Sequence, residues 1–248
     1  MLKLAGECGI RAAEADVWRF PDGRRTALLV RRFDRATHGH GVSRIGFVSA
    51  HALLRLDLAL PAPADTLPYG TTGFTGHSLR KSYVSLASDM ARWCGGQAIH
   101  REERRELWRR IVFNSLIRNL DDHSKNHGML CVDMAKQRWQ LSPAFDLVPS
   151  SATAEQAALS MAYRYVPPGH RGKQVTAPRL VTRIDRSDLL GAVIEHYAYT
   201  GDEAANYFRF SASPVATRWR SLLAAEGLPA IEADRLNRAF ALAAEMAG

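Results

Sequence analysis

The stretch from Arg101 to Leu120 carries apolar side chains at helical spacing over most of its length. These positions form one broad stripe, made of Leu107, Trp108, Ile111, Val112, Phe113, Leu116, Ile117 and Leu120. The pattern predicts a helix that buries this stripe and begins with a charged, solvated turn in which Glu106 and Arg110 can pair. The helix runs directly into the polar run Asp121–Asn126. A rigid element is therefore expected to fix the positions of these polar side chains.

The rest of the chain alternates between strand and helix patterns. Strands are expected at 16–20 and 27–33, around the turn signal Pro21-Asp22-Gly23, and at 129–132 and 138–141, which gives two hairpins. Helices are expected at 1–8, 48–56, 78–94, 186–198, 213–226 and 230–247, whereas 66–76 and the basic segment 167–173 are expected to be loops. Many helices with two hairpins indicate an α+β fold.

Composition places the chain among ordinary packed globular proteins. It is 46% hydrophobic and 23% charged, which excludes collagen-like, disulfide-scaffold and wholly disordered classes. A formal net charge of +8 favours contact with polyanions such as nucleotide phosphates or nucleic acid. Cys8, Cys94 and Cys131 form no Cys-x-x-Cys pair, so reduced, inert thiols are expected. No apolar run reaches the roughly 18 residues of a membrane span and no signal-peptide core is present, so a cytoplasmic location is expected.

Three polar residues around the second hairpin are spaced as phosphoryl transfer requires. Asn126 follows Asp121 by five residues, and Asp146 lies twenty residues further on, beyond the hairpin. In such sites one carboxylate accepts the proton of the attacking hydroxyl, while an amide oxygen and a second carboxylate hold Mg²⁺ against the nucleotide phosphates. Protein kinases use the same order and spacing. The three residues are therefore candidates for a kinase-type site.

Each of these residues also has an ordinary structural explanation. Asp121 or Asp122 could simply end the helix, although a carboxylate at a helix C-terminus opposes the helix dipole. Asn126 could be a left-handed turn residue, and Asp146 could be a turn former or a helix N-cap. Taken together, the spacing favours the functional explanation.

Two histidines and a lysine lie in the same segment. His123 and His127 are four residues apart, which would suit zinc on a helix, but they lie past the expected helix end and have no glutamate between them. His123 is instead expected to be a hydrogen-bonded scaffold residue. Lys125 could offer a point charge to the transferring phosphate or simply be exposed.

Two parts of the chain closely resemble the HipA family of toxin kinases. The first is Asn114–His127 together with Trp139–Pro149, and the second is Leu29–Arg35, which is similar to the family's Arg-Phe-Asp-Arg stretch. The resemblance implies a protein-kinase-like fold, with a mostly helical C-lobe that carries the catalytic hairpin and a remnant β-hairpin of the N-lobe. It implies that residues 1–40 are the N-lobe remnant with the hinge, and that 41–248 are the helical C-terminal lobe.

The same resemblance implies roles for individual residues. Asp121 is the implied catalytic base, and Asn126 with Asp146 are the implied Mg²⁺ ligands. Arg31 to Phe33 would be the hinge, whose backbone would meet the adenine of ATP, and Asp34 would lie beside the ribose. The full nucleotide-binding set implied in this way is Arg31, Arg32, Phe33, Asp34, His123, Ser124, Lys125, Asn126, Phe145 and Asp146.

The resemblance further implies a serine/threonine kinase that acts as the toxin of a type II toxin–antitoxin system. It would transfer a phosphoryl group from Mg-ATP to a protein hydroxyl, with an aminoacyl-tRNA synthetase as the implied substrate class. A HipB-like DNA-binding antitoxin is the implied partner. The chain has no DNA-reading motif, so contact with DNA is expected only through that antitoxin.

The family's Gly-rich phosphate loop and phosphate-binding lysine lie upstream of the Arg-Phe-Asp-Arg stretch. Only 32 residues precede Phe33, and they contain neither feature, so an N-terminally truncated kinase is expected. One alternative is a catalytically impaired kinase that acts as a binding module for an antitoxin or for a separate N-lobe chain. A small-molecule phosphotransferase is disfavoured, because Asn119 stands where the His of a His-x-Asp motif would be.

Overall fold

The computed structural model describes residues 1–23, 25–39, 41–57, 79–152, 157–171, 174–176 and 178–247. The expected loop at 66–76 lies outside these residues, as do residues 172 and 173 of the expected loop at 167–173. The part of that loop which is described is not irregular, because Gly169–Arg171 forms strand β9 and pairs with β10 (Gln174–Thr176).

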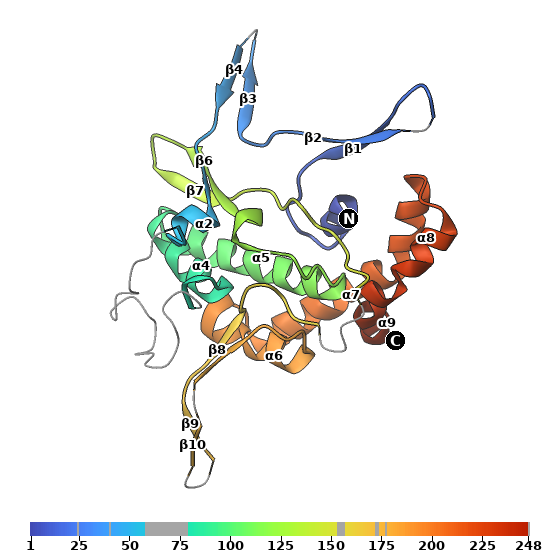
Figure 1. Cartoon of the computed structure of the whole chain (residues 1–248). Coiled ribbons are helices and arrows are strands. Elements are labelled where there is room, and N and C mark those ends of the chain that lie inside the picture. Colours follow the sequence, from blue (N-terminus) through green and yellow to red (C-terminus); the bar gives the residue numbers. More distant parts are fainter. Residues whose placement is uncertain are drawn as a thin grey trace.

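Helix α5 (Gln97–Leu116) runs through the middle of the helical body, as Figure 1 shows. Its apolar stripe is buried as expected, and it contacts α4 (Tyr83–Asp89), the π-helical segment η4 (Val193–Tyr197) and two later helices. The helix starts earlier than expected and ends at Leu116, because Arg118 adopts a left-handed conformation with φ 50°.

The expected ion pair of α5 does not lie at a solvated turn. Glu106 and Arg110 do pair, at 2.9 Å, but both side chains are buried. Arg110 also donates to the carbonyl of Ser142 at 2.7 Å, which ties α5 to the chain just before Phe145 and Asp146. A buried ion pair of this kind needs such extra hydrogen bonds to offset the loss of hydration.

The N-terminal helix α1 (Leu2–Glu7) packs on α7 (Gly201–Ala225), whose contacts join the two ends of the chain. Leu4 and Cys8 are buried there, and Lys3 pairs with Glu226 just beyond α7 at 2.6 Å. The expected helix over 1–8 is thus present, and Gly9 follows it at φ 71°. The expected boundary near residue 40 stays a prediction.

Two hairpins project from the body (Figure 1). The expected one is formed by β1 (Ala15–Arg19) and β2 (Thr26–Val30), paired antiparallel with Ala15 opposite Val30. The second, β3 (Arg35–His38) with β4 (Gly41–Arg44), was not expected. Residues 31–34, which include the expected hinge Arg31–Phe33, connect the two hairpins.

A three-stranded antiparallel sheet forms beside α5, in the order β5 (Phe47–Ser49), β6 (Gly128–Asp133), β7 (Arg138–Leu141). The second expected hairpin, β6–β7, is therefore confirmed. The expected helix at 48–56 is wrong at its start, because Phe47–Ser49 pairs with β6 instead. Ser49 then caps the short helix α2 (Ala50–Leu53), which lies next to the polar run.

The C-terminal third is mainly helical. After β8 (Arg164–Val166) and β11 (Arg179–Val181), which were not expected, come α6 (Arg186–Gly191), η4, α7, α8 (Ala230–Arg235), η5 (Asn237–Phe240) and α9 (Ala241–Ala247). Helix α7 begins well before the expected residue 213, because Thr200 and Glu203 form a capping box at its N-terminus.

Two further expectations concern the cysteines and membranes. Cys8, Cys94 and Cys131 are free and buried, and burial raises the pKa of Cys8 and Cys94 to about 12. Among the described residues, no helix combines the length and the apolar character that crossing a bilayer requires.

Candidate active site

The polar run after α5 is anchored by Asp122, which is 1% exposed. Its Oδ2 accepts hydrogen bonds from the Tyr83 hydroxyl and, at 2.6 Å, from Nδ2 of Asn114, and it lies 2.9 Å from Nε2 of His127. Its carbonyl accepts a bond from the Ser160 hydroxyl at 2.7 Å. Burial alone would raise the pKa of Asp122, but the charge and hydrogen bond of His127 bring it below its ordinary value. Asp122 is thus an ionised structural hub.

Asp121 has the opposite environment, because its side chain is exposed at the surface of the same run. The neighbouring hub fixes its backbone, and Nδ2 of the buried Asn126 donates to its carbonyl at 3.4 Å. Within the same polar run, residues Ser124–Asn126 form a 3₁₀ turn, η3. The arrangement presents one carboxylate to solvent on a rigid base, as a general base requires.

Asn119 links this run to Asp146. Its side-chain nitrogen donates to Oδ1 of Asn114 at 3.1 Å and to the carbonyl of Asp146 at 3.3 Å. Asp146 has a φ of 57°, a conformation that costs most residues energy and that often marks functional sites. A continuous chain of hydrogen bonds therefore runs from Asp122 through Asn114 and Asn119 to Asp146.

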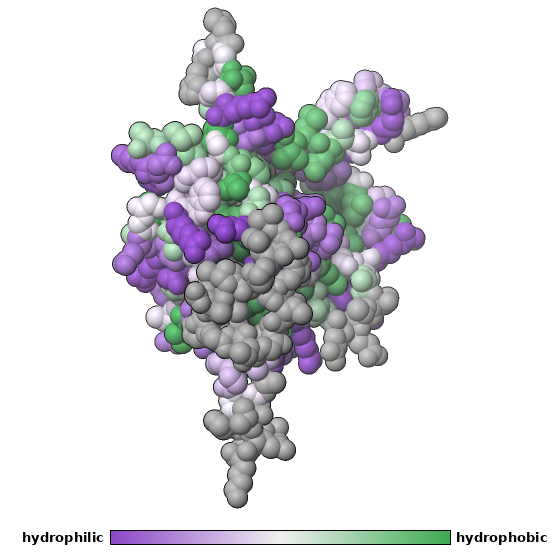
Figure 2. Space-filling model, turned by 60° about the vertical axis from the view of Figure 1, so that its left-hand side comes forward, coloured by the Kyte–Doolittle hydropathy of each residue, from purple (hydrophilic) through white to green (hydrophobic). Residues whose placement is uncertain are grey.

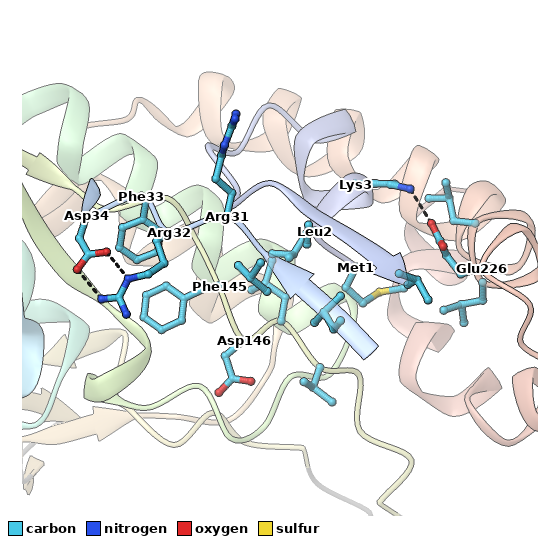
Figure 3. A pocket seen from close by; sticks show the side chains of 18 of the residues that line it. Met1, Leu2, Lys3, Arg31, Arg32, Phe33, Asp34, Phe145, Asp146 and Glu226 are labelled. Atoms are coloured by element: carbon cyan, nitrogen blue, oxygen red, sulfur yellow. Dashed lines mark hydrogen bonds and ion pairs between the residues drawn. The ribbon is translucent and has the colours of Figure 1, made fainter. Parts of the chain in front are cut away.

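The exposed carboxylate of Asp146 lines a pocket of about 770 Å³ (Figure 3). Residues 31–34 and Lys125 line it as well, and Phe33 packs near Phe145 with ring centres 5.6 Å apart. Most of the remaining wall is apolar and comes from α1, β1, β2 and the end of α7: Met1, Leu2, Ala15, Val17, Leu28, Val30, Leu222 and Leu223. A flat apolar ring with a phosphate tail suits such a pocket.

Arg31 and Arg32, in the expected hinge, pair with carboxylates of the chain. Arg31 pairs with Glu14 at 2.7 Å and points away from the pocket, whereas Arg32 reaches Asp34 with two hydrogen bonds (Figure 3). Arg35 also donates to Asp34, at 2.5 Å. The hydrogen bonds from Arg32, and the positive charge of both arginines, lower the pKa of Asp34 to about 2. Both oxygens of Asp34 thus already accept hydrogen bonds.

The expected site residues fall into two groups. Arg31, Arg32, Phe33, Asp34, Lys125, Phe145 and Asp146 line the pocket, while Asp121, His123, Ser124 and Asn126 lie outside the described lining. His123 was expected to be a hydrogen-bonded scaffold residue, but its buried Nδ1 has no hydrogen-bond partner among the described residues. Nε2 of His127 makes the contact with Asp122 instead. The roles of all these residues stay predictions.

Asn126 and Asp146 fit a magnesium ion by their chemistry. Because Nδ2 of Asn126 donates to Asp121, the amide turns its oxygen to the other side, as a cation ligand requires. No group of three or more His, Cys, Asp or Glu side chains suited to a metal gathers in the described part of the chain. An amide and a carboxylate oxygen, completed by substrate phosphates, are a usual protein environment for Mg²⁺.

Sequence reasoning missed the supporting residues Asn114, Asn119 and Asp122. One signal was present: Asn114 interrupts the most apolar part of the α5 stripe, and a buried amide needs partners. The apolar wall from α1 and α7 has no comparable local signal, because it depends on how the chain ends pack.

Comparison with models of known protein families shows to which family the chain belongs. The model of the HipA-like C-terminal domain matches residues 1–198. The chain belongs to the HipA-like family. No curated protein matches it.

Two solved structures resemble this HipA-like chain. The first is a chain from the Shewanella oneidensis complex of HipA, HipB and operator DNA, with a TM-score of 0.65 and 19% identity over 99% of this chain and 53% of that one. The second is the Helicobacter pylori proinflammatory kinase CtkA, with a TM-score of 0.52 and 12% identity over 99% of this chain and 80% of that one. The chain thus spans about half the length of the first. These likenesses confirm the expected kinase-like C-lobe fold.

Proposed function

We propose that this HipA-like chain binds Mg-ATP in the pocket and transfers its γ-phosphoryl group to a serine or threonine hydroxyl of a protein. The observation that carries the proposal is the hydrogen-bond chain Asp122–Asn114–Asn119–Asp146. This hydrogen-bond chain connects the polar run, which carries Asp121 and Asn126, to Asp146, whose carboxylate lines the pocket. Phosphoryl transfer depends mainly on positioning and electrostatics, so a pre-formed link of this kind supports the assignment.

In this proposal each residue has one task. Asp121 accepts the proton of the substrate hydroxyl, which its exposure allows. Asn126 and Asp146 hold the magnesium ion, which neutralises charge on the phosphates. Lys125, at the pocket wall, offers a positive charge to the transferring phosphate.

The adenine would lie against the aromatic side of the pocket. Phe33 packs close to Phe47 and Phe145, which gives a flat apolar wall beside the hinge. Because Arg31 and Arg32 are already paired with carboxylates, recognition would come from the hinge backbone. A ribose contact by Asp34 would have to compete with Arg32 and Arg35, and it stays a prediction.

The wider role follows from the family. The S. oneidensis relative was solved with HipB and operator DNA. We propose a HipB-like antitoxin as partner, contact with DNA only through it, and a toxin's role toward a protein substrate such as an aminoacyl-tRNA synthetase. In the same proposal residues 1–40 form the hinge-side segment and 41–248 the catalytic lobe.

A second candidate function is a binding module for a separate N-lobe chain. Strand β2 favours it, because Leu28 and Leu29 are 64% and 54% exposed although they point to opposite faces of the hairpin. Figure 2 shows apolar surface where the two hairpins leave the body. The discriminating experiment is to measure Mg-ATP binding with and without a strand-rich N-lobe chain, and with Leu29→Lys, outside the described pocket lining, to weaken docking. Binding that requires the added chain would favour the module.

The proposal is tested by titrating Mg-ATP into the protein in a calorimeter and by following phosphoryl transfer. Wild type and Asp133→Asn, a matched carboxylate change at the outer end of β6, should bind alike. Asp146→Asn should lose most of the binding that depends on Mg²⁺. Equal binding by all three proteins, or none by any, would overturn the role given to Asp146.

A further inference from the structure

Helix α2 lies against the turn that carries Lys125 and Asn126. Its position is fixed by β5, which pairs with β6, and by the amide of Ala50, which donates to the carbonyl of His127 at 2.8 Å. His51 is the second residue of this helix and faces the turn. The polar run is thus held from two sides: from α4 and α5 through Asp122, and from α2.

His51 connects two groups through its two ring nitrogens. Nδ1 lies 3.1 Å from the hydroxyl oxygen of Ser124, and Nε2 lies 2.7 Å from Oδ1 of Asp57. An ionised carboxylate only accepts hydrogen bonds, so Nε2 of the neutral ring carries the proton and Nδ1 accepts. The Ser124 hydroxyl then donates to Nδ1, which gives a consistent relay from Ser124 through His51 to Asp57.

Ser124 is 2% exposed and is the first residue of the turn. Its hydroxyl therefore depends on a protein acceptor rather than on water. A buried hydroxyl that lost its acceptor would leave an unpaired polar group, which destabilises its position. The turn is only three residues long, so any shift of Ser124 also moves Lys125 and Asn126. Burial also argues against Ser124 itself as an attacking nucleophile.

We infer that His51, oriented by Asp57, is a positioning residue for the turn Ser124–Asn126. It would set the place of Lys125 at the pocket wall and of the Asn126 amide oxygen. The inference rests on the proposed Mg-ATP site, to which it adds a residue from a part of the chain far from Asp121 and Asp146. His51 touches neither nucleotide nor substrate in this scheme.

Substitutions at position 51 separate the two ends of the relay. His51→Asn keeps a polar atom near the place of Nδ1 and can accept from Ser124, whereas His51→Gln places its amide near Nε2 and serves only Asp57. His51→Ala removes both. The matched control is His100→Ala, another half-buried helical histidine, whose Nε2 lies 2.7 Å from the carbonyl of Ala87, away from the turn.

The first measurement is amide hydrogen exchange of the whole chain without nucleotide. His51→Ala and His51→Gln should speed exchange at the amide of Asn126, which donates to the carbonyl of His123 at 2.9 Å, by about tenfold, which corresponds to one lost buried hydrogen bond. His51→Asn should restore slow exchange, and His100→Ala should leave this amide unchanged. Unchanged exchange in His51→Ala, or equal rescue by Asn and Gln, would overturn the inference.

The second measurement is the dissociation constant of Mg-ATP for the same variants. We expect about tenfold weaker binding for His51→Ala and His51→Gln, near-normal binding for His51→Asn, and no change for His100→Ala. If wild type binds Mg-ATP and His51→Ala binds it equally well, the inference fails while the proposed function stands. If wild type itself does not bind, the proposed function fails first.

Discussion

The side-chain amide of Asn119 donates a hydrogen bond to the main-chain carbonyl of Asp146 over 3.3 Å. The two residues are separated by the polar run and the whole β6–β7 hairpin, so this bond closes a long loop of chain. It also acts on a residue whose left-handed conformation is intrinsically unfavourable by about 1–2 kcal/mol. The orientation of the Asp146 carboxylate therefore depends on a buried amide in the segment between α5 and the polar run.

Replacing Asn119 by alanine should destabilise the protein by about 1–3 kcal/mol, because Oδ1 of Asn114 and the carbonyl of Asp146 would lose a buried donor. Urea unfolding measures this change. The matched control is Asn206→Ala on the exposed side of α7, which should stay within about 0.5 kcal/mol of wild type. Equal stability of the two variants would show that the Asn119 bridge does not restrain Asp146.

Replacing Asp146 by glycine should separate stability from binding. Glycine adopts φ near 57° without strain, so the variant should unfold at the same temperature as wild type or slightly above it. Binding of Mg-ATP should be lost, since the carboxylate is gone. The control is Gln137→Gly, at φ 49° in the β6–β7 turn, which relieves the same backbone strain away from the pocket and should keep Mg-ATP binding. A clear loss of stability in Asp146→Gly would give the carboxylate a structural role instead.

The adjacent residues Asp121 and Asp122 should respond in opposite ways. Asp121→Asn should abolish phosphoryl transfer and change the free energy of unfolding by less than about 0.5 kcal/mol, because the side chain is exposed. Asp122→Ala should cost about 3–5 kcal/mol, because it leaves buried donors of Tyr83, Asn114 and His127 without their acceptor. Radiolabel transfer and urea unfolding of both variants check the pair; turnover by Asp121→Asn would refute its role as base.

The parts of the fold that could be predicted from the sequence are those with local causes. The periodicity of α5, the turn signals of β1–β2 and β6–β7, and the polar run shortly after α5 all lie within short segments. One local signal went unused: Thr200 and Glu203 stand three apart in the spacing of a capping box, which marks the true start of α7.

The parts that could not be predicted depend on distant contacts. Phe47–Ser49 is a strand only because β6, some eighty residues later, offers it an edge to pair with. The pair Glu106–Arg110 was expected at a solvated turn, but the later chain buries it. The same holds for the site, since the sequence alone does not tell which of Asp121 and Asp122 is buried.

His196 should make the stability of the protein depend on pH. Burial, with the nearby positive charges of Arg164 and Arg104, lowers its pKa to about 4, below the 6.5 expected in the unfolded chain. Between these values the unfolded chain binds a proton that the folded protein does not, so stability falls as pH drops from about 6.5 to 4. The full loss is about 3 kcal/mol. Urea unfolding at half-unit steps of pH measures it, and His196→Gln, which cannot titrate, should flatten the curve over this window. A slope that persists unchanged in that variant would assign the dependence to other groups.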